Sequence, residues 1–182
     1  MANRRASGRA KVLKTKILYK GKVFSVRQDR VSEPGGVVAG RDIVVHRGSV
    51  VVLPVFSDGG ILLVRQYRHA IGSFLWELVA GRIEPGESGP AAARRELIEE
   101  TGYTARRVSP LLEIFPSPGF VSERMSIFLA SGLQQGPAQP EEDERITPKI
   151  FPLAALEKMI RRGKLHDAKS VAAILFYARF LA

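Results

Sequence analysis

The sequence contains no cysteine, so it can form no disulfide bond, thiolate zinc site or cysteine nucleophile. It also lacks long apolar runs, because the stretches at 50–56 and 172–176 are far shorter than the roughly 20 residues that cross a bilayer. We therefore expect no membrane partner. The absence of thiols fits a reducing compartment, and no apolar secretion signal is visible, so we predict a cytoplasmic protein.

Acidic residues are missing from the N-terminal part, where the first is Asp29, and the whole chain has a net charge of +10. Such a balance is typical of proteins that bind nucleic acid, anionic lipid or a phosphorylated small molecule. An arginine-rich start is also typical of a mitochondrial transit peptide, but from Lys11 onward the apolar residues follow a strand pattern. We interpret residues 1–10 as a flexible basic tail, for which nucleic-acid binding is a minor alternative.

The hydrophobic content of 45% in 182 residues is enough to build one medium domain with a small addition. We predict an N-terminal β region at 11–48 and the main domain at 49–182. Because strands and helices do not alternate strictly as βαβ units, we expect an α/β fold, a sandwich with a mixed β-sheet. The predicted strands lie at 12–31 (two, around a turn at 20–22), 41–46, 50–56, 61–67, 76–80, 111–115, 125–130 and 149–151, and the helices at 90–101, 153–162 and 167–181.

Three glutamates share one face of the predicted helix at 90–101, because Glu96, Glu99 and Glu100 stand three and four residues apart. Like charges at this spacing destabilise a helix unless cations neutralise them. Carboxylate oxygens clustered in this way suit Mg²⁺, which keeps some of its water and takes further oxygens from substrate phosphates. Glutamates alone are also typical of a solvated surface, so the neighbouring residues have to decide.

From Gly81 the sequence is GRIEPGESGPAAARRELIEETGY, which resembles the Nudix box. The box consists of Gly, five residues, Glu, seven residues, and then Arg-Glu-aliphatic-any-Glu-Glu-any-Gly-aliphatic. The last position departs from the pattern, with Tyr103 where an aliphatic residue is usual, but this position packs and does not react. The matching residues are Gly81, Glu87, Arg95, Glu96, Leu97, Glu99, Glu100 and Gly102.

The resemblance implies a Nudix α/β/α sandwich that uses Mg²⁺, with Mn²⁺ as a possible substitute. It implies that Glu96 and Glu100 bind metal directly, that Glu99 completes the set and takes part in catalysis, and that the backbone carbonyl of Ala80 is a further ligand. The remaining motif residues are structural in this reading. Gly81 and Gly102 shape the backbone, while Glu87 and Arg95 hold the loop against the helix, although Arg95 as a phosphate ligand stays an alternative.

Residues outside the box resemble the ADP-ribose pyrophosphatase branch of this family. Pro118, sixteen residues after Gly102, matches the proline marker of that branch, although Ser-Pro-Gly is also a generic turn sequence. Weaker similarities lie at 21–26, 41–46, 65–68 and 167–170. The resemblance implies hydrolysis of ADP-ribose to AMP and ribose 5-phosphate. It also implies a homodimer in which the N-terminal strands reach the partner's site.

The branch places its catalytic base on a loop after the box, where an acidic run follows Pro140 in this chain. Glu142 is the first candidate and Glu144 the second, and crowding of like charges would raise the pKa of one such carboxyl, as suits a general base. For the substrate phosphates we choose Arg68, because guanidinium binds phosphate through paired N–H groups, with Arg41 and Arg65 as weaker choices. Pro118 completes the predicted substrate site.

Two other functions remain open. One is hydrolysis of a different nucleotide sugar such as GDP-mannose, since the box determines the chemistry but not the substrate. The other is a non-catalytic Nudix module that senses ADP-ribose or binds nucleic acid. The box is intact here and the residues after Pro152 are too few for the winged-helix domain usual in such regulators, so an enzyme is favoured.

Overall fold

The computed structural model describes residues 8–137 and 145–182. The chain divides into two compact units, one made of Met1–Arg47 and Ser117–Glu123, the other of Gly48–Pro116 and Arg124–Ala182. No described helix is long and apolar enough to cross a membrane. The predicted N-terminal β region at 11–48 falls almost entirely in the first unit, which also includes the segment containing Pro118.

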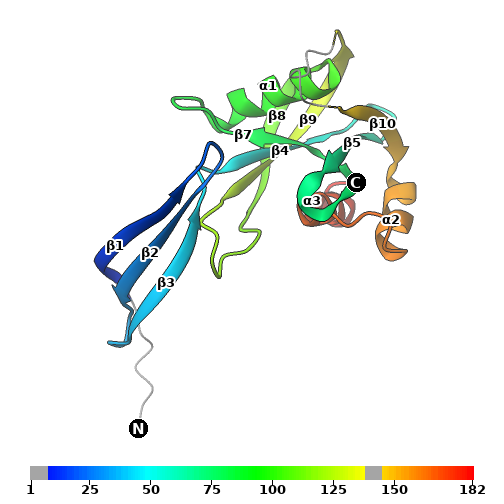
Figure 1. The fold of residues 1–182 in the computed structure, drawn as a ribbon. Coiled ribbons are helices and arrows are strands. Elements are labelled where there is room, and N and C mark those ends of the chain that lie inside the picture. The colour runs from blue at the N-terminus through cyan, green and yellow to red at the C-terminus, as the bar shows by residue number, and fades with distance from the viewer. Residues whose placement is uncertain (1–7, 138–144) are drawn as a thin grey trace. The chain divides into compact units, whose positions relative to one another are not determined.

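The larger unit contains two β-sheets, labelled in Figure 1. A four-stranded sheet has the order β7-β4-β9-β8, formed by Val79–Arg82, Ser49–Pro54, Met125–Gln135 and Tyr103–Ile114. In it β4 runs parallel to β9 and antiparallel to β7, which confirms the predicted mixed sheet. The second, three-stranded sheet has the order β10-β5-β6, formed by Thr147–Pro152, Gly60–Arg68 and Ser73–Glu77, with the short 3-10 helix η1 at His69–Ile71.

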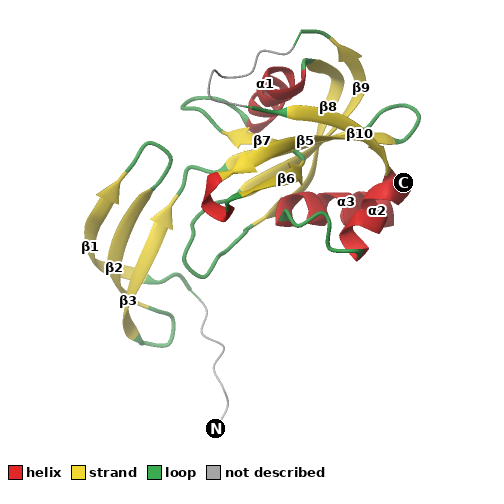
Figure 2. Cartoon of the chain, turned by 45° about the vertical axis from the view of Figure 1, so that its right-hand side comes forward, coloured by secondary structure: helices red, strands yellow, loops and turns green. Residues whose placement is uncertain are grey.

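Three helices cover the sheets of this unit among the residues that the structure describes: α1 (Gly89–Thr101), α2 (Leu153–Arg161) and α3 (Ala168–Phe180). Strand β4 is buried on both faces and its side chains alternate. Val51 and Leu53 pack in a cluster with residues of α2 and α3, whereas Val50 and Val52 pack in a cluster with residues of α1. The helices therefore lie on opposite faces, as Figure 2 shows, and the predicted α/β sandwich is confirmed.

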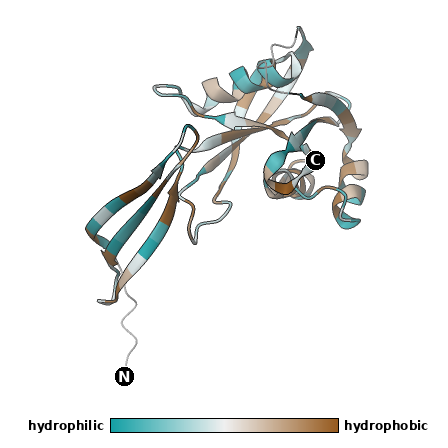
Figure 3. Cartoon of the chain, viewed as in Figure 1, coloured by the Kyte–Doolittle hydropathy of each residue, from teal (hydrophilic) through white to brown (hydrophobic). Residues whose placement is uncertain are grey.

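In its described residues, the first unit contains an antiparallel sheet in the order β1-β2-β3, formed by Lys11–Lys20, Ser25–Ser32 and Val38–Val45. Hydrophobic and hydrophilic stretches alternate along its strands in Figure 3. Asp29, on β2, is a charged residue that is buried. It accepts a hydrogen bond from Thr15 and pairs with Arg27 at 3.0 Å. Many apolar side chains stay exposed, including Val12, Ile17 and Leu18.

Several strand boundaries differ from the prediction, among them that of β9, which ends at Gln135 and not at 130. Strand β8 begins at Tyr103, eight residues earlier than expected, and pairs with β9 along nearly its whole length. It tolerates Pro110 because it is an edge strand and has a bulge at that point. The single strand predicted at 76–80 is two strands, β6 and β7, which belong to different sheets and are separated only by Leu78.

Candidate functional site

Helix α1 begins and ends where the motif requires. The side chain of Ser88 caps its N-terminus by accepting a hydrogen bond from the amide of Ala91 at 3.4 Å, and Pro90 occupies the first turn. At the other end Gly102 adopts a left-handed conformation with φ of 75° and donates its N–H to the carbonyl of Ile98. These caps determine where the helix begins and ends, and the spacing of three and four residues puts the three glutamates on one face.

The glutamate face of α1 lies against the strand β7 that precedes the loop. A Cβ added to Gly81 would lie 1.9 Å from the carboxyl carbon of Glu96, so only glycine lets this carboxylate rest against the backbone there. Glu100 is buried with 5% exposure. The structure therefore brings the carboxylate of Glu96 to the residue that directly follows Ala80, whose carbonyl is the other predicted metal ligand of this region.

Arg95 joins the loop to the helix through five acceptor oxygens. Its guanidinium contacts both carboxylate oxygens of Glu87 at 3.1 Å and donates to the carbonyl of Arg82 at 2.9 Å. The remaining nitrogen lies 2.8 Å from a carboxylate oxygen of Glu96 and 2.8 Å from one of Glu99. Hydrogen bonding to Arg95 lowers the pKa of Glu87, and hydrogen bonding to Glu87 raises the pKa of Arg95.

The residues of this face fit a divalent metal ion. Their donors are carboxylate oxygens, the ligand type that Mg²⁺ and Mn²⁺ accept, and glycine at position 81 leaves room for Glu96 beside the backbone. Within residues 8–137 and 145–182, no three acidic or histidine side chains are arranged to enclose a metal on their own.

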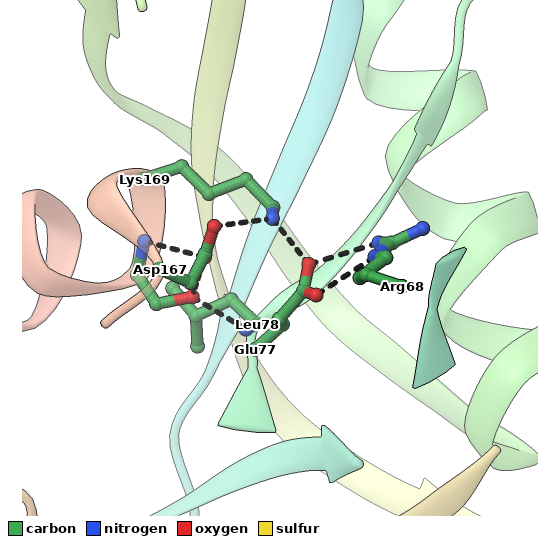
Figure 4. Close-up of polar contacts among 6 residues, drawn as sticks. Arg68, Glu77, Leu78, Asp167 and Lys169 are labelled. Carbon is green, nitrogen blue, oxygen red and sulfur yellow. Dashed lines mark hydrogen bonds and ion pairs between the residues drawn. The ribbon is translucent and has the colours of Figure 1, made fainter. Parts of the chain in front are cut away.

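A second charged cluster lies where β5, β6 and α3 meet. Figure 4 shows the carboxylate of Glu77 between the side chains of Lys169 and Arg68. Arg68 donates from Nε and Nη2 to the two carboxylate oxygens, each at 2.8 Å, and Lys169 donates to one of them at 2.5 Å. Asp167 in turn accepts from Lys169 at 2.8 Å. The predicted phosphate ligand Arg68 is thus held by a carboxylate that is only 2% exposed.

The opposite charges of Glu77 and Arg68 each stabilise the ionised form of the other residue. Burial alone would raise the pKa of Glu77, but the hydrogen bonds and charges of Arg68 and Lys169 outweigh it and lower that pKa. The pKa of Arg68 is raised, first by its hydrogen bond to Glu77 and also by the charge of Glu100. Arg68 is therefore within electrostatic reach of an acidic residue of the predicted metal site.

The other predicted substrate residues lie in different places. Arg65 is on β5 and its guanidinium lies 4.5 Å from the ring centroid of Phe74. Arg41 is on β3 in the first unit and forms an exposed ion pair with Glu33. Pro118 also belongs to the first unit, in the segment Ser117–Glu123. The candidate bases Glu142 and Glu144 lie outside the described residues.

Neither Glu77 nor Lys169 is among the site residues predicted from the sequence, although Lys169 lies in the segment 167–170 that resembles the ADP-ribose pyrophosphatase branch. One signal was present, since Glu77 is the single charged residue of an otherwise apolar stretch at 74–80. A carboxylate buried in such a stretch requires a cation or hydrogen-bond donors, because an unpaired buried charge is very unfavourable. The identity of its partner could not be predicted, since Lys169 lies 92 residues further along the chain.

Comparison with known protein families identifies the class to which this fold and site belong. The family model described as NUDIX domain matches residues 45–174, most of the chain, and the chain belongs to that family. The predicted Nudix resemblance is therefore confirmed.

Individual relatives indicate which members of this family the chain resembles. The chain is 34% identical to an ADP-ribose pyrophosphatase of Mycobacterium tuberculosis (strain ATCC 25618 / H37Rv) over 90% of its own length and 80% of the relative. It is 35% identical to an ADP-ribose pyrophosphatase of Bacillus subtilis (strain 168) over 87% of each chain. It also resembles a crystal structure of an ADP compounds hydrolase, with a TM-score of 0.82 at 25% identity, covering 96% of this chain and 95% of the other.

Proposed function

We propose that this Nudix enzyme hydrolyses the pyrophosphate bond of ADP-ribose, releasing AMP and ribose 5-phosphate, with Mg²⁺ as its metal ion. The observation that carries the proposal is the packing of Glu96 against Gly81 at the end of β7, which joins the acidic face of α1 to the loop of the box. The names of the relatives from Mycobacterium tuberculosis and Bacillus subtilis support ADP-ribose as the substrate.

Glu96, Glu99 and Glu100 would hold the metal together with the carbonyl of Ala80. When bound, a divalent ion neutralises phosphate charge and lowers the pKa of a coordinated water, with Mn²⁺ able to replace Mg²⁺ in such an oxygen site. The chain's own residues supply the rest. Arg95 keeps the loop at 83–88 on the helix, and Arg68 offers a guanidinium to the diphosphate of the substrate.

Proton abstraction from the attacking water needs a base near neutral pH. Glu142 is our first candidate and Glu144 the second, while Glu99 is the third, because it is the most exposed of the three glutamates on the helix face, at 30% exposure of its side chain. Replacing these three glutamates by glutamine, one at a time, identifies which of them is the base. The base is the residue whose replacement lowers kcat and removes the acidic limb of the pH profile, with KM nearly unchanged.

A homodimer in the cytoplasm is part of the same proposal. The apolar side chains exposed on β1, including Val12, Ile17 and Leu18, give a sheet surface that a second copy of the chain could cover. Light scattering of the purified protein checks this directly. A monomer at micromolar concentration would contradict it without affecting the proposed chemistry.

A substrate panel with product identification tests the function. Purified protein with Mg²⁺ is incubated with ADP-ribose, GDP-mannose and other nucleotide sugars, and the products are separated by chromatography. We expect AMP and ribose 5-phosphate in equal amounts and the highest kcat/KM for ADP-ribose. Turnover of GDP-mannose with none of ADP-ribose would favour the second candidate substrate. Binding of ADP-ribose without turnover of any compound would indicate a sensing module.

A further inference from the structure

Glu77 is a buried carboxylate whose two oxygens are fixed by cations from two different elements. Oε1 accepts from Nε of Arg68 at the end of β5, and Oε2 accepts from Nη2 of the same guanidinium. Lys169, in the first turn of α3, donates to Oε2 as well. A carboxylate held at both oxygens cannot rotate without breaking a charge-assisted hydrogen bond. The orientation of the guanidinium is therefore set by the pair of Glu77 and Lys169.

Arg68 keeps donors available despite this pairing. A guanidinium has five N–H groups, and within the described residues Arg68 uses two of them, on Glu77. Figure 4 shows its third nitrogen pointing away from the carboxylate. The outer edge of the group, formed by Nη1 and the second hydrogen of Nη2, has the geometry that binds two phosphate oxygens. With 40% exposure of the side chain, this edge can be reached by a ligand.

Lys169 is itself held in place by the start of α3. Asp167 accepts from Lys169 through one oxygen and, through the other, from the backbone and hydroxyl of Ser170. The hydroxyl of Ser170 accepts from the amide of Leu78 at 2.7 Å, and Leu78 is the residue after Glu77. The helix start thus contacts both the side chain and the backbone of the strand end that carries Glu77.

We propose that Glu77 and Lys169 are positioning residues, which hold Arg68 so that its outer N–H edge faces the diphosphate of the bound nucleotide. This rests on the proposed function, because it requires a diphosphate to bind beside the acidic face of α1. Preorganisation of this kind increases affinity because the side chain does not lose rotational freedom on binding. The negative charge of Glu100, a predicted metal ligand, also raises the pKa of Arg68, so the two side chains interact electrostatically.

A positioning role and a purely structural role predict different results in a double-mutant cycle. If Lys169 acts through Arg68, its replacement weakens ligand binding only while Arg68 is present. If the cluster only holds α3 on the sheet, replacement lowers the melting temperature and changes binding equally with and without Arg68. The cycle therefore separates the two roles even when both variants are less stable than the wild type.

The probe is ADP-ribose with a methylene group in place of the bridging diphosphate oxygen, which cannot be hydrolysed at that position. Its Kd is measured by calorimetry, with Mg²⁺, for the wild type, Lys169→Met, Arg68→Ala and the double variant. We expect Lys169→Met to raise Kd about three- to tenfold in the wild-type background and less than twofold in the Arg68→Ala background. Lys169→Arg should restore most of the affinity. Lys158→Met, at an exposed lysine of α2, is the control for loss of one positive charge.

The outcomes are distinct. Equal effects of Lys169→Met in both backgrounds, or no effect in either, would overturn the positioning role while leaving the proposed function intact. A wild type that neither binds the probe nor hydrolyses ADP-ribose would overturn both. If Lys169→Met does not fold, Glu77→Gln replaces it in the cycle, because glutamine keeps the shape and one acceptor oxygen. We expect the same dependence on Arg68 for that variant.

Discussion

Two arginines of the larger unit pair with glutamates, and their hydrogen bonds are distributed in opposite ways. Arg95 contacts five acceptor oxygens, from Glu87, Glu96, Glu99 and the carbonyl of Arg82. Arg68 donates two N–H groups to Glu77 and, within the described part of the chain, keeps three for other partners. The side chain of Arg95 is 27% exposed and that of Arg68 40%. The first is suited to hold the fold and the second to bind a ligand.

The number of N–H donors that are not yet bound indicates which of the two arginines is better suited to bind a phosphate. The sequence suggests either, because both lie in or near recognisable motifs and arginine binds phosphate well. An arginine with all five donors committed would have to break ion pairs with Glu87 or Glu99 before it could contact a phosphate. The contacts therefore favour a structural role for Arg95 and support Arg68 as the phosphate ligand. Arg95 contacts Glu96 and Glu99 on the acidic face of α1, whereas Arg68 is linked to that face only through the charge of Glu100, which raises its pKa.

The largest effect on activity should follow from replacement of Glu100, a predicted metal ligand whose charge also raises the pKa of Arg68. Glu100→Gln keeps the shape of the side chain but removes its negative charge, so we expect kcat for ADP-ribose to fall on the order of 10³-fold or more. Circular dichroism should show an unchanged fold. Glu113→Gln, at an exposed glutamate of β8, is the matched control and should keep full activity. Normal turnover by Glu100→Gln would refute its metal role.

Next in size is the effect of Arg68→Ala on substrate binding. Loss of a hydrogen-bonded cation–phosphate contact costs about 1.5–3 kcal/mol, so KM for ADP-ribose should rise roughly tenfold to 100-fold. Steady-state kinetics at saturating Mg²⁺ measures it. If KM stays the same while Arg95→Ala raises it, the assignment of the two arginines is reversed.

A smaller effect, on stability, should distinguish Arg95. Arg95→Ala leaves Glu87, Glu96 and Glu99 without their shared cation, and we expect the free energy of unfolding to fall by about 1–3 kcal/mol. Arg95→Lys should recover only part of this loss, because one ammonium group cannot reach all five acceptors. Urea unfolding followed by fluorescence gives the values. A lysine variant as stable as the wild type would show that charge alone matters here.

The smallest effect concerns pH. Because Arg95 lowers the pKa of Glu87 in the folded state, the pair stabilises the protein at pH values above the ordinary glutamate pKa of 4.5. This stabilisation is lost as the pH falls through the lowered pKa, where Glu87 becomes protonated. The difference in unfolding free energy between wild type and Glu87→Gln should therefore be about 1 kcal/mol at pH 7 and smaller at pH 3, below the ordinary glutamate pKa. An equal difference at both values would exclude the ionic contribution.

The elements that could be predicted from the sequence are those with strong local signals. Ser88, Pro90 and Gly102 mark the ends of α1, and the apolar run at 50–56 marks the central strand β4. The early part of β8 was missed because Arg106, Arg107 and Pro110 give it the composition of a loop. Its pairing with β9 makes it a strand, and pairing between distant segments is not visible in one sequence.

In the candidate site too, the features that could be predicted from the sequence are those with local signals. The spacing of Glu96, Glu99 and Glu100 is local and predicts their common face, whereas the contact of Glu77 with Lys169 depends on how α3 packs on the sheet. Arg68 can offer paired N–H groups to a phosphate from only one edge of its guanidinium. Its Nε edge is occupied by Glu77, so a phosphate would have to bind the outer edge. Glu142 and Glu144 remain predictions.

The most direct test of the proposed chemistry is the initial rate of ADP-ribose hydrolysis as a function of Mg²⁺ concentration, with AMP and ribose 5-phosphate measured together. We predict that the rate is zero in the presence of a chelator, rises to saturation with Mg²⁺, and yields the two products in equal amounts. A rate independent of the metal ion, or no release of AMP at any Mg²⁺ concentration, would contradict the proposed function.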